Sequence, residues 1–116
     1  MDYRVGLIGC GGIAGTWIKA VAQTDRCSID QVFDVDAGAA ATRAKEVGVK
    51  AASDLSEVME SSRINLVVIG TPTPSHPDLV AEAARNGKHV MCEKPMALDL
   101  ATCQGMIDCC DENGVK

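Results

Sequence analysis

The sequence predicts an α/β fold in which a doubly wound parallel sheet is covered by helices on both faces. Short apolar runs alternate along the chain with stretches whose apolar residues recur at helical spacing. The short runs are apolar at successive positions, which indicates strands buried on both faces and therefore a parallel sheet. With 116 residues, 47% of them hydrophobic, the chain is large enough to enclose one core as a single domain.

Five apolar runs are predicted to be the strands of this sheet, at residues 5–9, 29–33, 49–52, 64–69 and 89–92. We expect the strand order 3-2-1-4-5. In a doubly wound sheet the first strand lies in the middle, the next strands are added on one side of it, and the remaining strands are added on the other side. The last residues, 114–116, resemble the beginning of another strand. We therefore expect the chain to be a fragment of a longer protein.

Helices are expected between the strands, at residues 13–21, 37–47, 54–60, from 75 until Gly87 and from 100 until Gly114. Asp36 and Asp99 stand where an N-cap is needed. Ser75 and Asp78 match an S-x-x-D capping box with proline in the first turn. In the last helix the apolar face is predicted to run through Leu100, Cys103, Ile107 and Cys110.

Charge and hydropathy exclude several classes of function. The net charge of −5 argues against nucleic-acid binding. No apolar run approaches the roughly 20 residues needed to cross a bilayer. The N-terminus lacks the basic and apolar regions of a secretory signal. We therefore expect a cytoplasmic location with neither a membrane nor a nucleic acid as partner.

The six cysteines show no C-x-x-C pair and no histidine at zinc spacing; they are Cys10, Cys27, Cys92, Cys103, Cys109 and Cys110. Reduced thiols of a cytosolic protein explain them, so no metal site is predicted. A metal or redox role is the alternative.

The first strand-to-helix junction reads GCGGIAG over residues 9–15 and fits the pattern G-x-G-x-x-(G/A). Gly9 and Gly11 permit a tight turn and the close approach of a pyrophosphate to the backbone. Free N–H groups at the start of the helix, at Gly12 and Ile13, would hold the phosphate oxygens. Ala14 would let the helix pack closely on the sheet. The junction predicts a dinucleotide site.

Asp34 lies at the end of the second strand, in QVFDVD, where a dinucleotide-binding fold requires an acidic residue. Its carboxylate can accept hydrogen bonds from both hydroxyls of the adenosine ribose. It would repel a 2′-phosphate, and no Arg or Lys adjoins it in the sequence, so NAD is favoured over NADP. The alternative is that Asp34 only caps a turn.

The loop after the fourth strand, GTPTPSH at residues 70–76, lies where open α/β sheets bind ligands. Its prolines make it rigid, so Thr71 and Pro72 are predicted to form a wall beside the cofactor. His76 either faces the cofactor or only begins the next helix. A stiff connection without a binding role is the alternative for the whole loop.

Lys94 follows the fifth strand, in Glu93-Lys94-Pro95, and is the candidate catalytic residue. Its ammonium would emerge at the same edge of the sheet as the glycine turn and Asp34. There it could hydrogen-bond a substrate hydroxyl and stabilise developing negative charge, or contact the nicotinamide ribose. The alternative is a surface lysine beside Glu93.

Four segments in this order, GLIGCGGIAG, VFDVD, GTPTPSH and GKHVMCEKPMAL, resemble the N-terminal domain of the glucose-fructose oxidoreductase, inositol dehydrogenase and rhizopine-catabolism oxidoreductase family. The resemblance covers nearly the whole chain and implies a Rossmann-type NAD(P)-binding domain over residues 1–116. It implies that Lys94 reaches nicotinamide and substrate and that Glu93 lies near the nicotinamide ribose. It also makes Lys94-Pro95 a candidate cis peptide. Asn65 departs from the family, which often has Asp there.

The resemblance further implies a parent that transfers hydride between NAD and a secondary alcohol or ketone of a sugar or cyclitol. A second, C-terminal domain would supply most substrate contacts and a D-x-x-x-H motif, and it is absent from this sequence. The fragment alone is expected to bind dinucleotide without turnover, and the parent to be a homo-oligomer. Two alternatives remain: a hydrolase or lyase-like relative that uses NAD transiently, and a non-enzymatic dinucleotide sensor.

Overall fold

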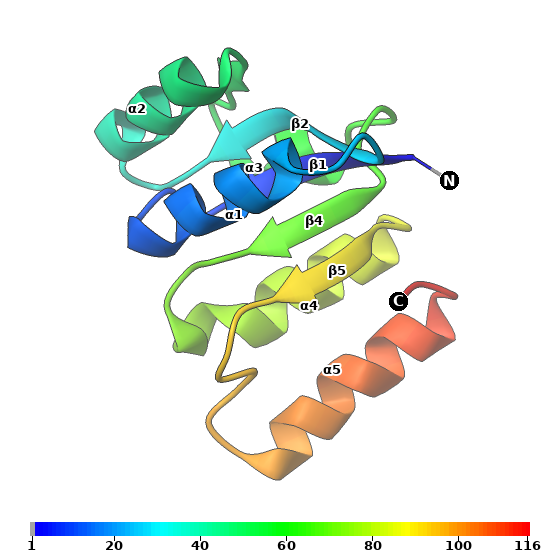
Figure 1. Cartoon of the computed structure of the whole chain (residues 1–116). Coiled ribbons are helices and arrows are strands. Elements are labelled where there is room, and N and C mark those ends of the chain that lie inside the picture. Colours follow the sequence, from blue (N-terminus) through cyan, green and yellow to red (C-terminus); the bar gives the residue numbers. More distant parts are fainter. Residues whose placement is uncertain (1) are drawn as a thin grey trace.

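Parallel strands form a five-stranded sheet in the computed structural model, which describes residues 2–116. The strand order is β3-β2-β1-β4-β5, so the predicted fold class and order are confirmed (Figure 1). The strands are β1 (Tyr3–Ile8), β2 (Cys27–Phe33), β3 (Lys50–Ala51), β4 (Leu66–Ile69) and β5 (His89–Cys92). Each neighbouring pair runs parallel. The order reverses between β1 and β4, which places a crevice at their carboxyl ends.

The third and fourth strands are shorter than predicted, and β1 and β2 each begin two residues earlier. β3 has two residues, and β4 begins at Leu66, directly after Asn65, whose side chain bonds to the start of β1. The Oδ1 atom of Asn65 accepts a hydrogen bond from the Arg4 N–H at 2.8 Å, and its Nδ2 donates to the Asp2 carbonyl at 3.1 Å. The amide that departs from the family pattern therefore ties the start of β4 to the start of β1.

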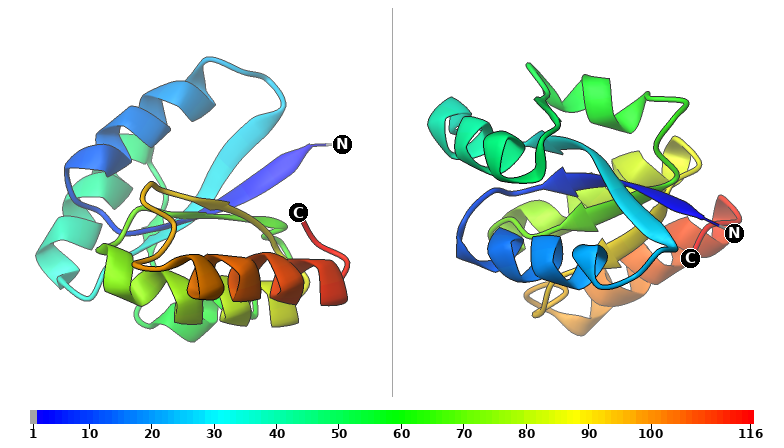
Figure 2. Two further views of the ribbon diagram at one scale, coloured as in Figure 1. Left: turned by 90° about the horizontal axis from the view of Figure 1, so that it is seen from below. Right: turned by 45° about the horizontal axis from the view of Figure 1, so that its top comes forward.

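Helices cover both faces of the sheet, which lies between the two layers in Figure 2. They are α1 (Gly12–Ala22), α2 (Ala37–Val47), α3 (Leu55–Met59), α4 (His76–Arg85) and α5 (Leu100–Glu112). One core cluster joins α1 and α2 to the sheet, and a second joins α3, α4 and α5 to the opposite face. Strands buried by both layers explain the continuous apolar runs of the sequence.

Local caps explain most of the helix starts. Asp36 accepts hydrogen bonds from the amides of Gly38 and Ala39, and Asp99 accepts one from the amide of Thr102, as predicted. The prediction of a capping box at Ser75 is wrong, because the Ser75 side chain makes no cap hydrogen bond to α4. A 3-10 turn, η1 (Thr73–Ser75), runs directly into α4, and the Ser75 hydroxyl donates to the Pro72 carbonyl instead of capping the helix.

The apolar face of α5 also differs from the prediction. Met106 is the buried residue of this helix, and Cys110 packs against the same cluster, whereas Leu100 is 88% exposed. Ile107, also on the predicted face, is 45% exposed. Farther along, the segment 114–116 lies beside β5: the Val90 N–H donates to the Lys116 carbonyl at 2.7 Å, although no strand is formed there within the described residues.

No helix in residues 2–116 combines the length and apolar character that a membrane crossing requires.

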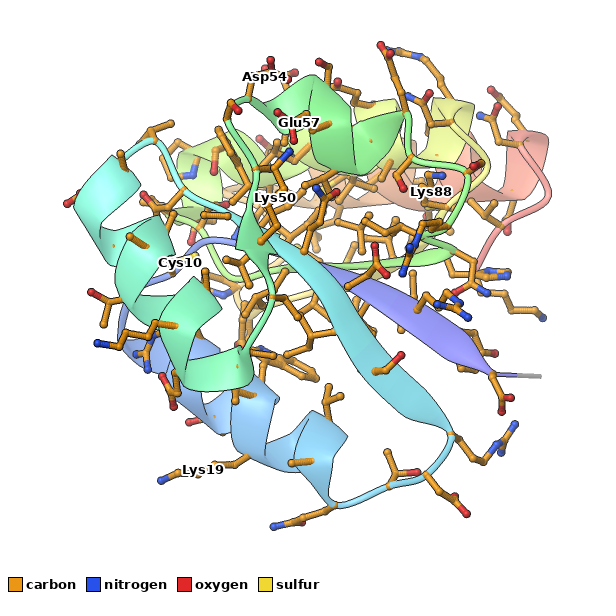
Figure 3. All side chains as sticks on the ribbon, turned by 90° about the horizontal axis from the view of Figure 1, so that it is seen from above. Cys10, Lys19, Lys50, Asp54, Glu57 and Lys88 are labelled. Carbon is orange, nitrogen blue, oxygen red and sulfur yellow. The ribbon has the colours of Figure 1, made fainter. Side chains whose placement is uncertain are left out.

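Lys88, labelled in Figure 3, is buried directly before β5, whereas Lys94 follows the other end of that strand. Its ammonium donates to the backbone carbonyls of Ser61 and Ile64, and burial lowers its pKa. We expect Lys88→Met to lower the free energy of unfolding by about 2–3 kcal/mol, because both carbonyls lose their donor. Urea denaturation measures this change. Lys19→Met, at an exposed position on α1, is the control and should cost no more than about 0.5 kcal/mol; equal effects of the two variants would contradict the prediction.

Candidate functional site

The predicted site residues lie at one edge of the sheet, because the last residues of β1, β2, β4 and β5 are paired with one another. Ile8 at the end of β1 is paired with Phe33 of β2 and Ile69 of β4, and Ile69 is paired with Cys92 of β5. The residue after each strand is therefore presented at one edge of the sheet. Asp34 and Lys94, far apart in the sequence, lie on that edge, as predicted.

The glycine turn after β1 contains two glycines with different physical roles. Gly9 has a φ of +94°, and a Cβ there would lie 2.7 Å from the backbone carbonyl of Gly70. The fold itself therefore requires glycine at this position. Gly11 is extended, with a φ of −77°, and a Cβ there would meet no protein atom within 4 Å. The protein's own packing therefore does not explain glycine at position 11, whereas a ligand lying against the backbone would.

The start of α1 is suited to an anion. Gly11 is its N-cap and has no side chain to accept the first amides, and the first turn carries no acidic residue. The N–H groups of Gly12 and Ile13 lie in this first turn, where intrahelical acceptors are lacking. Ala14 is fully buried in the cluster between α1 and the sheet, so its contribution is close packing. The amides at this helix start can bind phosphate oxygens.

The carboxylate of Asp34 is fixed by the glycine turn itself. Its Oδ2 atom accepts a hydrogen bond from the Cys10 N–H at 2.7 Å, and its Oδ1 accepts one from the Asp36 N–H at 2.8 Å. Asp34 therefore caps a turn, which was the alternative interpretation. Each carboxylate oxygen keeps further acceptor capacity, so the same geometry can bind ribose hydroxyls.

Arg43, on α2, is a residue of this site that the sequence did not reveal. Its Nη2 donates to the Gly11 carbonyl at 2.8 Å and its Nε to the Cys10 carbonyl at 3.4 Å, while Nη1 pairs with Glu46. These bonds tie the carbonyls of the glycine turn to α2. The available signal was weak: Arg43 stands beside Ala40 and Ala44, the buried residues of α2.

The thiol of Cys10 lies inside the glycine turn and is buried. Its pKa is raised to about 11, mainly by burial and also by the nearby Asp34 carboxylate, while Arg43 acts in the opposite direction. The thiol therefore stays protonated at neutral pH, and its Sγ lies 3.5 Å from the Phe33 carbonyl. Burial likewise raises the pKa of Cys92 to about 11. Neither thiol is a reactive nucleophile.

A cleft of about 760 Å³ opens beside the glycine turn at the edge where the strands end. Predicted residues that line it are Gly9, Gly11, Asp34, Thr71 and Pro72. Its wall also includes three apolar residues that the sequence did not single out, namely Val35, Leu55 and Leu79. Val35 is 94% exposed directly after Asp34. The signal available in the sequence was an apolar residue, Val35, placed between Asp34 and Asp36 directly after the second strand.

His76 begins α4 and is 1% exposed, so its ring does not face the cleft. The Nε2 atom lies 2.8 Å from the Thr71 carbonyl, and Nδ1 lies 3.1 Å from the carbonyls of both Pro95 and Met96. Direct contact of the ring with a cofactor is therefore not supported. The ring instead links the loop after β4 to the loop after β5.

Glu93 and Lys94 lie at the start of the loop after β5. The Glu93 Oε1 atom accepts a hydrogen bond from Nε1 of Trp17 at 2.8 Å, and Oε2 accepts one from the Lys94 N–H at 3.2 Å. The Lys94-Pro95 peptide bond is cis, as the resemblance implied. Lys94 is exposed, and its ammonium has no ion-pair partner within residues 2–116. Its charge is available to a ligand at this edge.

Comparisons with known proteins show the family to which the chain belongs. Residues 3–116 match the family described as "Oxidoreductase family, NAD-binding Rossmann fold". The chain is 36% identical over 99 residues to an inositol 2-dehydrogenase of Rhizobium meliloti, covering 85% of this chain and 30% of the relative. It is 33% identical over 110 residues to the 2,7-anhydro-N-acetylneuraminate hydratase of Escherichia coli, covering 95% of this chain and 29% of that protein.

A solved structure shows the same fold with a dinucleotide bound. The WlbA dehydrogenase of Bordetella pertussis, crystallised with NADH and UDP-GlcNAcA, has a TM-score of 0.93 and 34% identity over 99% of this chain and 35% of its own. The chain spans about 30% of the length of the curated relatives it matches. By sequence match, fold and strand-end geometry, the chain belongs to the oxidoreductase family that includes glucose-fructose oxidoreductase and inositol dehydrogenase, and it is the NAD-binding Rossmann domain of that family.

Proposed function

We propose that this chain is the dinucleotide-binding part of an NAD-dependent oxidoreductase whose substrate is a secondary alcohol or ketone of a sugar or cyclitol. The observation that carries the proposal is that the glycine turn, Asp34 and the Thr71-Pro72 wall line one cleft, and that Lys94 follows a strand ending at the same edge of the sheet. The similarity to an inositol 2-dehydrogenase, and to a dehydrogenase crystallised with a nucleotide sugar, supports the substrate class. The substrate contacts themselves would come from a C-terminal domain outside these residues.

Each part of the dinucleotide has a matching group at this edge. The amides of Gly12 and Ile13 bind the pyrophosphate, helped by the positive end of the α1 dipole. Asp34 binds the adenosine ribose. The apolar wall of Val35, Leu55 and Leu79 suits the flat adenine ring. This arrangement leaves the nicotinamide end on the side of Lys94.

Bound NAD supplies the hydride acceptor. The chain's own contribution to the reaction is Lys94, whose ammonium donates a hydrogen bond to the reacting oxygen of the substrate. As the alcohol is oxidised, with its hydroxyl proton taken by a base of the C-terminal domain, this bond stabilises the negative charge that develops on that oxygen. Glu93 fixes the backbone of Lys94 through its Oε2 atom.

Asp34 is expected to set the preference for NAD over NADP. Its carboxylate would repel a 2′-phosphate, and the nearby cation, Arg43, already pairs with Glu46 and with carbonyls of the glycine turn. We expect the chain to bind NADH at least about tenfold more tightly than NADPH, and Asp34→Ala to remove most of this preference. Titration calorimetry with both dinucleotides measures it.

Asp36→Ala is the matched control for the Asp34 prediction. Asp36 caps α2 and should affect stability, by about 1 kcal/mol, without changing the ratio of the two affinities. Equal affinity of the unmodified chain for NADH and NADPH would contradict the assignment of Asp34.

A second candidate function is suggested by the similarity to the hydratase. In that case the whole protein would use NAD transiently in a lyase-like reaction and regenerate it. Absorbance of NADH at 340 nm during turnover separates the two: a dehydrogenase accumulates NADH in proportion to product, whereas a lyase-like enzyme forms product without net NADH.

The proposal also includes a cytoplasmic, homo-oligomeric whole protein. Light scattering on the purified whole protein tests the oligomeric state, and a mass equal to that of one chain would contradict it.

A further inference from the structure

We propose that Trp17 is a positioning residue that acts through Glu93 to hold Lys94 and its loop at the nicotinamide end of the dinucleotide. This inference rests on the proposed function and adds a residue from α1 to the part of the site formed by β5. Trp17 is the only tryptophan of the chain.

The contact joins two parts of the site that are far apart in the sequence. The indole Nε1–H of Trp17, on α1, donates to Oε1 of Glu93 at 2.8 Å. The second oxygen of the same carboxylate, Oε2, accepts the backbone N–H of Lys94 at 3.2 Å. One carboxylate therefore links the helix that presents the pyrophosphate amides to the backbone of the candidate catalytic lysine.

The geometry of β5 explains why Glu93 points toward α1. Side chains alternate along a strand, and Val90 and Cys92 pack into the cluster on the side of α4 and α5. The intervening residue Met91, which is 46% exposed, and Glu93 beyond it therefore belong to the opposite face, on which α1 lies and where Trp17 reaches Glu93. The Glu93 N–H still donates to the Ile69 carbonyl at 2.9 Å, so the alternation continues to this residue.

The orientation of the indole is fixed by packing rather than by the hydrogen bond. Trp17 packs against the core cluster formed by α1, α2 and the sheet, and it is half-buried. Its N–H therefore has a defined direction before Glu93 is considered. A donor held in this way fixes its acceptor with little additional loss of side-chain freedom.

The loop after β5 is thus held from two sides. Trp17 binds Glu93 from the α1 face, and the buried His76 contacts the carbonyls of Pro95 and Met96 from α4. Lys94 stands between these two attachments and is exposed. Removing the Trp17 bond leaves the His76 attachment intact, so the expected defect is a displaced Lys94 in a folded domain.

A double-mutant cycle with two ligands tests the inference. NADH carries the nicotinamide half, whereas ADP carries only the adenosine and pyrophosphate. We expect Trp17→Phe, which keeps an aromatic ring but loses the donor, to weaken NADH binding by about five- to tenfold and to leave ADP binding within about twofold. Glu93→Ala should show the same pattern. Adding Trp17→Phe to Glu93→Ala should cause no further loss, because the two residues act as one unit.

The two ligands keep the outcomes distinct. Retained ADP binding shows that each variant is folded with an intact glycine turn. Equal weakening of ADP and NADH, additive effects of the two substitutions, or no effect of Trp17→Phe would each overturn the role of Trp17. Failure of the unmodified chain to bind either ligand would overturn the proposed function, and with it the inference.

Discussion

Gly11→Ala is expected to weaken NADH binding by at least about tenfold while lowering the free energy of unfolding by no more than about 1 kcal/mol. A Cβ at position 11 meets no protein atom within 4 Å, and the residue has an extended backbone that alanine can adopt. The small expected cost is that of alanine at an N-cap. The added methyl group would stand in the cleft, where the pyrophosphate must approach the backbone. Calorimetry with NADH and urea denaturation give the two quantities.

Gly9→Ala is the matched control for Gly11→Ala. Its Cβ would lie 2.7 Å from backbone atoms of Gly70, at a φ of +94° that alanine rarely adopts. We expect this variant to lose about 2–4 kcal/mol of stability. Comparing the two variants separates the two reasons for glycine: Gly9→Ala should mainly lower stability, whereas Gly11→Ala should mainly lower NADH affinity. Normal NADH affinity of Gly11→Ala would place the pyrophosphate elsewhere.

Lys94→Ala is expected to lower the turnover of the whole protein by about 10²–10⁴-fold. The ammonium is exposed at the edge where the strands end and has no ion-pair partner in the described part of the chain, so its charge is available to the reacting oxygen. Affinity for NADH should fall by no more than about tenfold, because the phosphates and the adenosine are held by other residues. Steady-state kinetics, with the sugar or cyclitol that reduces NAD fastest, measures the effect.

Lys19→Ala provides the comparison for Lys94. Lys19 is an exposed lysine in the last turn of α1, far from the strand ends, as Figure 3 shows. Its replacement should leave turnover unchanged. If Lys94→Ala behaves in the same way, Lys94 is a surface charge, and another group must stabilise the negative charge on the reacting oxygen.

Sequence patterns predicted the fold well because the decisive signals are local. Buried strands read as apolar runs, and Asp36 and Asp99 cap helices through amides only two or three residues away. The predictions that were wrong also concern local detail. Ser75 lies in a 3-10 turn rather than at an N-cap, and Leu100 is exposed in the first turn of α5. In both cases the neighbouring structure, rather than the residue's own preference, determined the outcome.

The edge of the sheet on which the site lies was determined by the sequence alone. In a parallel sheet every strand ends at the same edge, so Gly9, Asp34 and Lys94 come together once the strands are identified. The tertiary structure alone determined how these residues are held. The bonds from Arg43 to the glycine turn, from Trp17 to Glu93, and from His76 to the loop after β5 join residues that are 19 to 76 positions apart in the sequence. Such contacts depend on how each helix is rotated on the sheet, and the packing of the whole core sets that rotation.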